Sequence, residues 1–502
     1  MSASHSKELP GTVSELVGRR FRIVPGVGLV DCDVNDHAQH QADQRLLPPR
    51  CRSITVQSAA RPAETGKMVT HMSVWARLRY RQETSGPAAV AVVGAGWVGR
   101  GLIWRLTATP GLTPALVVSR RPDAGVAALV ASGHSAVDIL VSEDPDALSE
   151  AVRTGRPAVT ASASAAVAVD GIDVVVEATG AIDFGATVVL DALAGGRHVV
   201  SINAEAEATV GYLMHTVARE NGVVYTFADG DQPGVLLRQL DFIEGLGFQP
   251  VAAVNCKRHL DVHQTPAAGL EFQRRDGTSL AITTSAGDGT KMHVENAVVA
   301  NVRGMPPDCR GMHGVRTTME HALGDVLTSI SRPGVVEYTL GGDFGAGVFV
   351  IGHASEPERI EQAMRFFKMG PGPDYLFFRP YHLVQLEMPV TIADVVLDQV
   401  GLGAQVGPPV AEVVAVAKRD LQPGEPLDGI GGYTTYGVID TATGAAGLLP
   451  VGFTEHATVV HRVRQDQPVS LDDVELDEDA PVFRLRARQD ALSVSAATAG
   501  PL

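Results

Sequence analysis

The chain has 502 residues, of which 45% are hydrophobic and 20% are charged, and its formal net charge is −16. A chain of this length exceeds one hydrophobic core and predicts roughly two to four domains, and its composition excludes a disordered polypeptide. The negative charge disfavours nonspecific binding to nucleic acid or to an anionic membrane.

The cysteines and the apolar runs indicate the compartment. The four cysteines show no CxxC or zinc-finger spacing, and no apolar run reaches the roughly 18 residues of a membrane span. The start also lacks the basic-then-apolar order of a secretory signal. We therefore expect a cytoplasmic protein with reduced thiols and with no membrane or nucleic-acid partner. The cysteines are Cys32, Cys51, Cys256 and Cys309.

Residues 1–72 show neither a period of two nor one of 3.6. We expect this segment to be a disordered extension, with a start codon placed ahead of the native start. The following stretch "SVWARLRYRQ" is typical of a helix.

From residue 88 onwards apolar strand patterns alternate with helix patterns, joined by short loops. This alternation predicts a parallel, doubly wound sheet over residues 73–227. The expected strands are 88–96, 113–119, 171–180 and 197–206, and the expected helices are 98–111, 144–155 and 184–196.

The pattern changes after residue 228. Polar strands are expected at "SLAITTSAG" (279–287) and "GVVEYTLGG" (334–342), with a helix at "MHVENAVVANV" (292–302), so residues 228–400 read as an α+β catalytic and substrate domain. The Gly- and Pro-rich stretch 401–409 is typical of a linker. Residues 408–492 then contain two similar β motifs, which predict a small all-β domain before a tail at 493–502.

A glycine-rich loop between the first strand and its helix has the pattern Gly94-x-Gly96-x-x-Gly99. The first glycine permits a tight turn, the second lets the backbone approach a pyrophosphate, and the third lets the helix pack on the strand. The helix N-terminus then faces the anion, with Trp97 and Val98 inside the loop. The pattern predicts a Rossmann dinucleotide-binding domain.

The end of the second strand bears on which nicotinamide coenzyme binds. An acid about 20 residues after the glycines would accept the ribose 2′-hydroxyl of NAD, but this chain has Ser119, Arg120 and Arg121 there. Guanidiniums and a hydroxyl suit the 2′-phosphate of NADP. The alternative is that the arginines are solvated and Asp123 serves NAD. The small turn Thr179–Gly180 is expected to let the nicotinamide ribose approach the backbone.

Hydride transfer also needs polar groups beside the substrate carbonyl. Four loops supply candidates, of which we select Asn203, Asp231, Lys257 and Lys291. Lys257 follows an apolar strand, where side chains emerge from a core. The alternative for Lys291 is a surface ion pair with Glu295, four residues further on one helix.

Two further segments have both a functional and a structural interpretation. Asp288-Gly289 is a candidate site element or simply a turn. The segment 367–383, with Lys368, Arg379 and His382 among aromatics, suits a phosphate or carboxylate, or is an aromatic core with solvated basic tips. The histidines have no zinc-site spacing, so no structural metal is expected.

From residue 73 to 492 the chain resembles the homoserine dehydrogenase-related NAD(P)-dependent oxidoreductases with a C-terminal SAF domain, and within them the deoxyxylulose-phosphate reductoisomerase-like group. The stretches that carry the resemblance are "GAGWVGRG", "GIDVVVEATG", "FADGDQPG", "DGTKMHVENAVVAN", "RGMHG", "KMGPGPDYLFFRPYHL", "VAEVVAVAKRDLQPGEPLDGIGGYT" and "LDDVELDED".

The resemblance implies a Rossmann domain, an α+β catalytic and dimerisation domain, and a small β-clip SAF domain that covers or binds rather than reacts. It implies NADP chemistry at the cleft between the first two, a homodimer, and a lysine-bearing strand and a "DGTK" motif that match at Lys257 and Lys291. Reductoisomerases commonly use a divalent ion, for which Asp231 and Glu295 are candidates. The sequence departs from the pattern at "KRHLD" (257–261), where an asparagine-rich segment is expected, and at Ser119.

Three functions follow as hypotheses. The first is an NADP-dependent oxidoreductase acting on a small polyhydroxylated carbonyl compound, including sugar phosphates, with or without skeletal rearrangement. The second is a plain dehydrogenase of a hydroxy acid or an amino alcohol. The third is a non-catalytic dinucleotide-sensing scaffold, against which the two lysines and Asn203 argue.

Overall fold

The computed structural model describes residues 22–24, 28–30, 72–344 and 347–499. The chain divides into two units, Met1–Arg61 and Pro62–Leu502. In the first unit, β1 (Arg22–Val24) pairs antiparallel with β2 (Gly28–Val30). The prediction of disorder for residues 1–72 otherwise lies outside the described residues. All that follows concerns the second unit.

Its amino-terminal half is a seven-stranded parallel sheet in the order β5-β6-β4-β3-β7-β8-β9. This confirms the predicted doubly wound α/β domain and its alternating elements. The strands are β3 (Ala88–Val93), β4 (Leu112–Val118), β5 (Leu140–Val141), β6 (Ala158–Thr160), β7 (Val174–Glu177), β8 (His198–Ser201) and β9 (Tyr225–Phe227). The helices are α2 (Val74–Ser85), α3 (Trp97–Thr107), α4 (Pro122–Ala131), α5 (Pro145–Arg153), α6 (Ala163–Ala168), α7 (Ile182–Ala194) and α8 (Ala204–Glu220).

A second, mixed sheet follows in the order β11-β12-β10-β13-β14. Its first three strands are parallel, and β13 and β14 are antiparallel to their neighbours. The strands are β10 (Phe248–Lys257), β11 (Val315–Arg316), β12 (Val335–Leu340), β13 (Val348–Ala354) and β14 (Asp374–Arg379). The helices are α9 (Gln232–Gly245), α10 (Pro266–Asp276), α11 (Leu280–Asp288), α12 (Thr290–Arg303), α13 (Ala322–Ser329), α14 (Pro357–Phe366) and α15 (Val384–Asp398).

One expected strand is wrong: residues 279–287 form most of helix α11. The Ser279 side chain accepts the backbone N–H of Ile282 and caps the helix N-terminus, and Gly289 ends the helix with a positive φ of 90°. Local capping therefore outweighs the strand preference of the threonines and the isoleucine.

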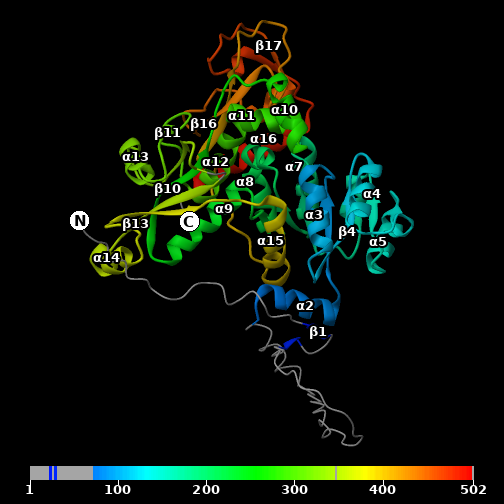
Figure 1. Ribbon diagram of the computed structural model, residues 1–502. Coiled ribbons are helices and arrows are strands. Elements are labelled where there is room, and N and C mark those ends of the chain that lie inside the picture. The colour runs from blue at the N-terminus through cyan, green and yellow to red at the C-terminus, as the bar shows by residue number, and fades with distance from the viewer. Residues whose placement is uncertain (1–21, 25–27, 31–71, 345–346, 500–502) are drawn as a thin grey trace, which may run out of the picture. The chain divides into compact units, whose positions relative to one another are not determined.

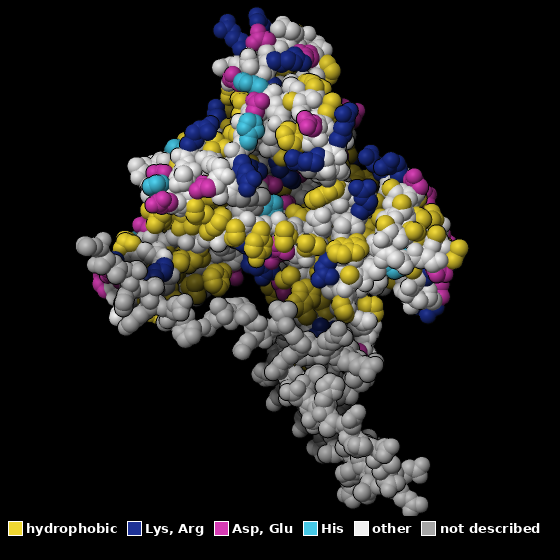
Figure 2. All heavy atoms as spheres, viewed as in Figure 1, with side chains coloured by type: hydrophobic (Ala, Val, Ile, Leu, Met, Phe, Trp, Pro, Cys, Tyr) yellow, Lys and Arg dark blue, Asp and Glu magenta, His cyan; other side chains and the backbone are white. Residues whose placement is uncertain are grey.

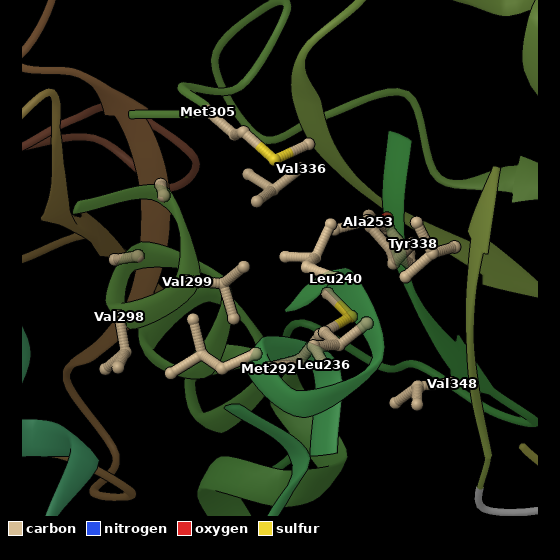
Figure 3. Packing of buried hydrophobic residues seen from close by; sticks show 14 of the residues in the cluster. Leu236, Leu240, Ala253, Met292, Val298, Val299, Met305, Val336, Tyr338 and Val348 are labelled. Carbon is tan, nitrogen blue, oxygen red and sulfur yellow. The ribbon is translucent and has the colours of Figure 1, made fainter. Parts of the chain in front are cut away.

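Helix α12 is the packing centre of the second half. Its apolar side chains meet those of α9 and of the mixed sheet (Figure 3), where Leu240, Met292 and Val299 are each 0% exposed. Burial of one such side chain stabilises the fold by about 1.5–3 kcal/mol. Because nearly all of α12 is buried, the polar residues of its first turns have fixed positions.

Helix α15 returns from the second sheet to the first domain. Its Met388 and Ile392 pack in one cluster with Leu102 and Ile103 of α3, and the two helices lie side by side in Figure 1. The domain of the seven-stranded sheet and the domain of the mixed sheet therefore share a continuous apolar contact.

The β module, residues 411–476, contains two small antiparallel pairs. The two motifs that the sequence shows as similar face each other, since Leu421 and Val463 exchange backbone hydrogen bonds of 2.8 and 3.3 Å. Helix α16 (Pro481–Ala499) follows and occupies the end of the region expected to be all-β. The strands of the β module are β15 (Ala411–Ala417), β16 (Thr435–Thr441), β17 (Ala457–Val459) and β18 (Val474–Leu476).

Within the described part of the chain, no helix has both the length and the apolar character needed to cross a membrane. Cys256 and Cys309 are free thiols, as expected, and the other two cysteines lie outside the described residues.

Candidate active site

The glycine loop has the geometry of an anion cradle. Gly94 has a φ of +108°, and a Cβ there would lie 2.8 Å from the carbonyl oxygen of Ala178. A Cβ on Gly99 would lie 1.9 Å from the Gly94 oxygen, whereas one on Gly96 would point into open space. No side chain caps α3 at Gly96. The free N–H groups of the first turn therefore face an open region, which is the arrangement by which helix N-termini bind anions.

The remaining predicted coenzyme residues lie around this loop. Trp97 is the first helical residue and is 43% exposed, and Val98 packs partly against the apolar core. After β4, the Ser119 hydroxyl donates to the Arg121 carbonyl at 2.9 Å. The Arg120 and Arg121 side chains are exposed and form no ion pair with another described residue.

Asn203 has a positioning role. It caps α8, because its Oδ1 accepts the Ala206 N–H at 3.0 Å while its Nδ2 donates to the Ala181 carbonyl at 3.0 Å. Both polar atoms of the carboxamide are therefore bound to backbone. Asn203 ties the turn after β7, which contains Thr179 and Gly180, to the start of α8.

Glu177, the last residue of β7, also holds the turn that contains Thr179 and Gly180. Its carboxylate accepts the Thr179 N–H at 2.8 Å and also the Thr179 hydroxyl. Complete burial raises the pKa of Glu177 to about 7, although these hydrogen bonds oppose the rise. Gly180 has a φ of +71°, which only glycine adopts at little cost.

Five ionisable side chains from helices α8 and α12, the turn before α9 and strand β10 form a group that we call the carboxylate–lysine cluster. Their charges act on one another's pKa values. Figure 2 shows basic and acidic side chains gathered in the hollow at the centre of this face. The cluster consists of Glu205 in the first turn of α8, Asp231 before α9, Lys257 at the end of β10, and Lys291 and Glu295 on α12.

Lys291 is the best-defined member of the cluster. Its Nζ lies 3.1 and 3.3 Å from the two carboxylate oxygens of Glu205, and its side chain is only 18% exposed. Burial lowers the pKa of Lys291, but the charges of Glu205, Asp231 and Glu295 outweigh this and raise it overall. Lys291 is therefore a permanently charged ammonium. The alternative of a surface pair with Glu295 is wrong, since Lys291 of α12 forms its ion pair with Glu205 of α8.

Glu295 is buried and held by an amide network. Asn255 donates to its Oε2 at 3.3 Å and exchanges two hydrogen bonds of 2.9 Å with Gln232. Burial raises the pKa of Glu295 to about 7, while the positive charge of Lys257 opposes the rise. A carboxyl group with this pKa exchanges a proton near neutral pH.

Lys257 emerges from the core at the end of β10, as expected from its strand. It is half-buried and has no ion pair with another described residue. Its charge is felt by the buried His293, whose pKa falls to about 3 because of burial and of Lys257. No carboxylate among the described residues therefore holds the Lys257 side chain in an ion pair.

Asp231 and His382 complete the site. Asp231 precedes α9, is 8% exposed, and does not cap the helix with its side chain. The His382 Nδ1 lies 3.3 Å from the Gly230 carbonyl oxygen. Burial and Lys257 lower the pKa of His382, and Asp231 opposes this.

The basic segment 367–383 does not form one anion site. Arg379 pairs with Glu387 and lies over the Tyr381 ring at 5.0 Å, while Lys368 is exposed on a separate turn. Only His382 of this segment reaches the cluster. Our selection from the sequence left out Glu205, which has no motif of its own. Its place two residues after Asn203, in the first turn of the helix that follows β8, was a signal.

Two family models match the chain. Residues 94–228 match the NAD binding domain of homoserine dehydrogenase, and residues 230–388 match the catalytic domain of oxidoreductase DRL. These ranges contain the glycine loop and the whole carboxylate–lysine cluster. The protein is an NAD(P)-dependent oxidoreductase.

Among solved structures, homoserine dehydrogenase from Thiobacillus denitrificans is 15% identical, with 67% of this chain and 84% of that one covered and a TM-score of 0.38. The 1-deoxy-D-xylulose 5-phosphate reductoisomerase from Zymomonas mobilis, in complex with NADPH, is 19% identical, with 43% and 57% covered and a TM-score of 0.30. No curated protein matches the sequence. These TM-scores are too low for the structural similarities to support a functional assignment.

The family resemblance also implies a divalent cation for this oxidoreductase, but the donor set does not fit one. Both oxygens of Glu205 bond to the Lys291 ammonium, and Glu295 is held by Asn255. Within the described ranges, no three His, Cys, Asp or Glu side chains are placed to hold a metal ion together. The expectation that Asp231 and Glu295 bind a cation is therefore not confirmed, and the positive charge that the structure does place beside these carboxylates is that of Lys291.

This assignment predicts the response to manganese. Mn²⁺ should leave the thermal unfolding midpoint of the wild type and of the exposed-lysine control Lys368→Met unchanged. Lys291→Met leaves three carboxylates without their cation, so its midpoint should fall and should be partly restored by Mn²⁺. Stoichiometric Mn²⁺ binding by the wild type, abolished by Glu205→Gln, would contradict the assignment.

Proposed function

We propose that this oxidoreductase reduces the carbonyl group of a small polyhydroxylated compound with NADPH. The observation that supports it most is the position of the carboxylate–lysine cluster beside the turn after β7 (residues 179–181), which we call the coenzyme turn. Asn203 bonds to Ala181 of that turn, and Glu205 follows two residues later with Lys291 on its carboxylate. A charged site with two lysines thus adjoins the place where a nicotinamide would lie.

Preference for NADP rests on the residues after β4. Ser119, Arg120 and Arg121 offer a hydroxyl and two unpaired guanidiniums at the end of that strand. Arginines bind a phosphate through charge-assisted hydrogen bonds. Asp123, which would serve NAD, lies in the first turn of α4 beyond the arginines.

The double variant Arg120→Ala/Arg121→Ala is expected to weaken NADPH binding at least tenfold and to leave NADH binding nearly unchanged, because only the 2′-phosphate loses its partners. Fluorescence titration with both coenzymes measures this. Asp123→Asn is the matched control. Tighter binding of NADH than NADPH by the wild type, lost in Asp123→Asn, would favour the NAD alternative.

The bound coenzyme supplies the hydride. Lys257 donates a hydrogen bond to the substrate carbonyl and stabilises the negative charge that develops on its oxygen. Glu295, with a pKa of about 7, holds a proton that it passes to this oxygen near neutral pH. Lys291 stays charged between the carboxylates and prevents their mutual repulsion from opening the site.

The Lys257→Met variant is expected to lose about a hundredfold or more in turnover while NADPH binding is kept, since the oxygen loses its charged donor. NADPH oxidation with a panel of ketoses, hydroxyaldehydes and their phosphates measures this. Analysis of the product distinguishes simple reduction from reduction with rearrangement.

The exposed-lysine variant Lys368→Met serves as the control. Because Lys257 lowers the pKa of Glu295, the residual activity of Lys257→Met should extend to higher pH than that of the wild type. Equal turnover in Lys257→Met and the wild type would remove the proposed role.

A further inference from the structure

Glu205 also lines a cavity of about 310 Å³. Its inner end contains buried polar side chains, with Glu205 8%, Ser285 2% and Thr454 0% exposed. Gly180 and Ala181 of the coenzyme turn form one side of its mouth. A volume of this size suits a small molecule rather than a dinucleotide.

The opposite wall of the cavity comes from the β module. Asp428, Gly429 and Ile430 line it from the loop before β16, and residues 451–455 line it from the short helix η2 (Val451–His456). Neither matched family model extends to this part of the chain.

A buried ion pair fixes the β module against the catalytic domain. The Lys418 Nζ lies 2.7 Å from Asp288 Oδ2 at the end of α11, and the two side chains are 2% and 0% exposed. The same ammonium donates to the carbonyls of Gln264 and Gly432 at 2.8 and 2.7 Å. Breaking such a pair is costly, so the module holds one position.

Two close contacts of glycine residues complete the attachment. A Cβ on Gly431 would lie 2.2 Å from the Ala281 carbonyl of α11, and one on Gly452 would lie 2.3 Å from Thr209 Oγ1 of α8. His456 also bonds to Asp183 of α7 at 2.6 Å. The β-module wall is therefore in contact with the helices that carry Glu205 and the coenzyme turn.

The charges of the lining indicate what the cavity accepts. Its lining includes three carboxylates and no Lys, Arg or His side chain. The Asp428 carboxylate is bound to the backbone N–H groups of Tyr433 and Thr434 at 2.6 and 3.0 Å. The Glu455 side chain is exposed and makes no hydrogen bond or ion pair with another described residue.

We propose that this cavity binds the substrate and that the β module, through Glu455, selects the end of the substrate that lies there. That end carries hydroxyl or ammonium donors and no phosphate, because the lining contains three carboxylates, of which Glu205 is paired with Lys291, and no cationic side chain of its own. The proposal deepens the proposed function and rests on it, because the cavity adjoins the coenzyme turn. A phosphate elsewhere on the substrate would lie on the Lys257 side of Glu205.

The test uses the full-length protein with and without saturating NADP⁺, and three probes: serinol, glycerol and glycerol phosphate. Saturation-transfer NMR titrations measure their dissociation constants. Serinol should bind most tightly and glycerol phosphate least. Glu455→Lys should weaken the binding of serinol at least about fivefold and strengthen the binding of glycerol phosphate, because the charge at the mouth of the cavity is reversed. Glu475→Lys, an exposed glutamate of the same module outside the cavity lining, should change neither.

Since Glu455 is exposed, its replacement removes no buried contact. Preferential binding of glycerol phosphate by the wild type, equal behaviour of the two lysine variants, or no binding of any probe while NADP⁺ still binds would each overturn the proposal. Failure of NADP⁺ itself to bind would instead contradict the proposed function. The titrations without coenzyme would still test whether the probes bind in the cavity.

Discussion

The site depends on the burial of the Lys291 ammonium between carboxylates. Glu205 contacts it directly, and Asp231 and Glu295 act on it through their charges. Three carboxylates brought together without a cation would repel one another and would be protonated or solvated. One lysine on a buried helix therefore lets elements from two domains meet. This constraint explains why α12 is packed on all sides, since a mobile helix would not keep the ammonium in place.

Around this ion pair, backbone contacts set the remaining geometry. The glycine loop leaves space at Gly96 while closing it at Gly94 and Gly99. Asn203 joins the turn after β7 to α8, and so fixes Glu205 relative to the coenzyme side. On the far side, the Lys418–Asp288 pair performs the equivalent task for the β module. Coenzyme loop, charged cluster and cavity wall are thus connected through buried contacts, which supports treating them as one site.

The sequence predicted the coenzyme domain well because apolar strands, glycines and helix starts are local signals. It placed Lys257 at a strand end and Asp231 on the turn before α9 for the same reason. The strand predicted at residues 279–287 is wrong, because the side chain of Ser279 caps a helix there. The sequence also missed the partner of Lys291, since Glu205 lies 86 residues away and only the packing of α8 against α12 brings them together. Asn203 was selected for its place after the last strand, and its contacts with the backbone of Ala181 and Ala206 could not be predicted from the sequence.

The central claim is that a nicotinamide coenzyme lies between the glycine loop and the carboxylate–lysine cluster. A crystal structure of the full-length protein with NADPH measures this most directly. The account predicts the pyrophosphate on the N–H groups after Gly96, the 2′-phosphate on Arg120 or Arg121, and the nicotinamide ring against Gly180 with Lys257 and Glu205 facing its reactive side. A coenzyme bound elsewhere, or a nicotinamide ring pointing away from Lys257 and Glu205, would contradict it.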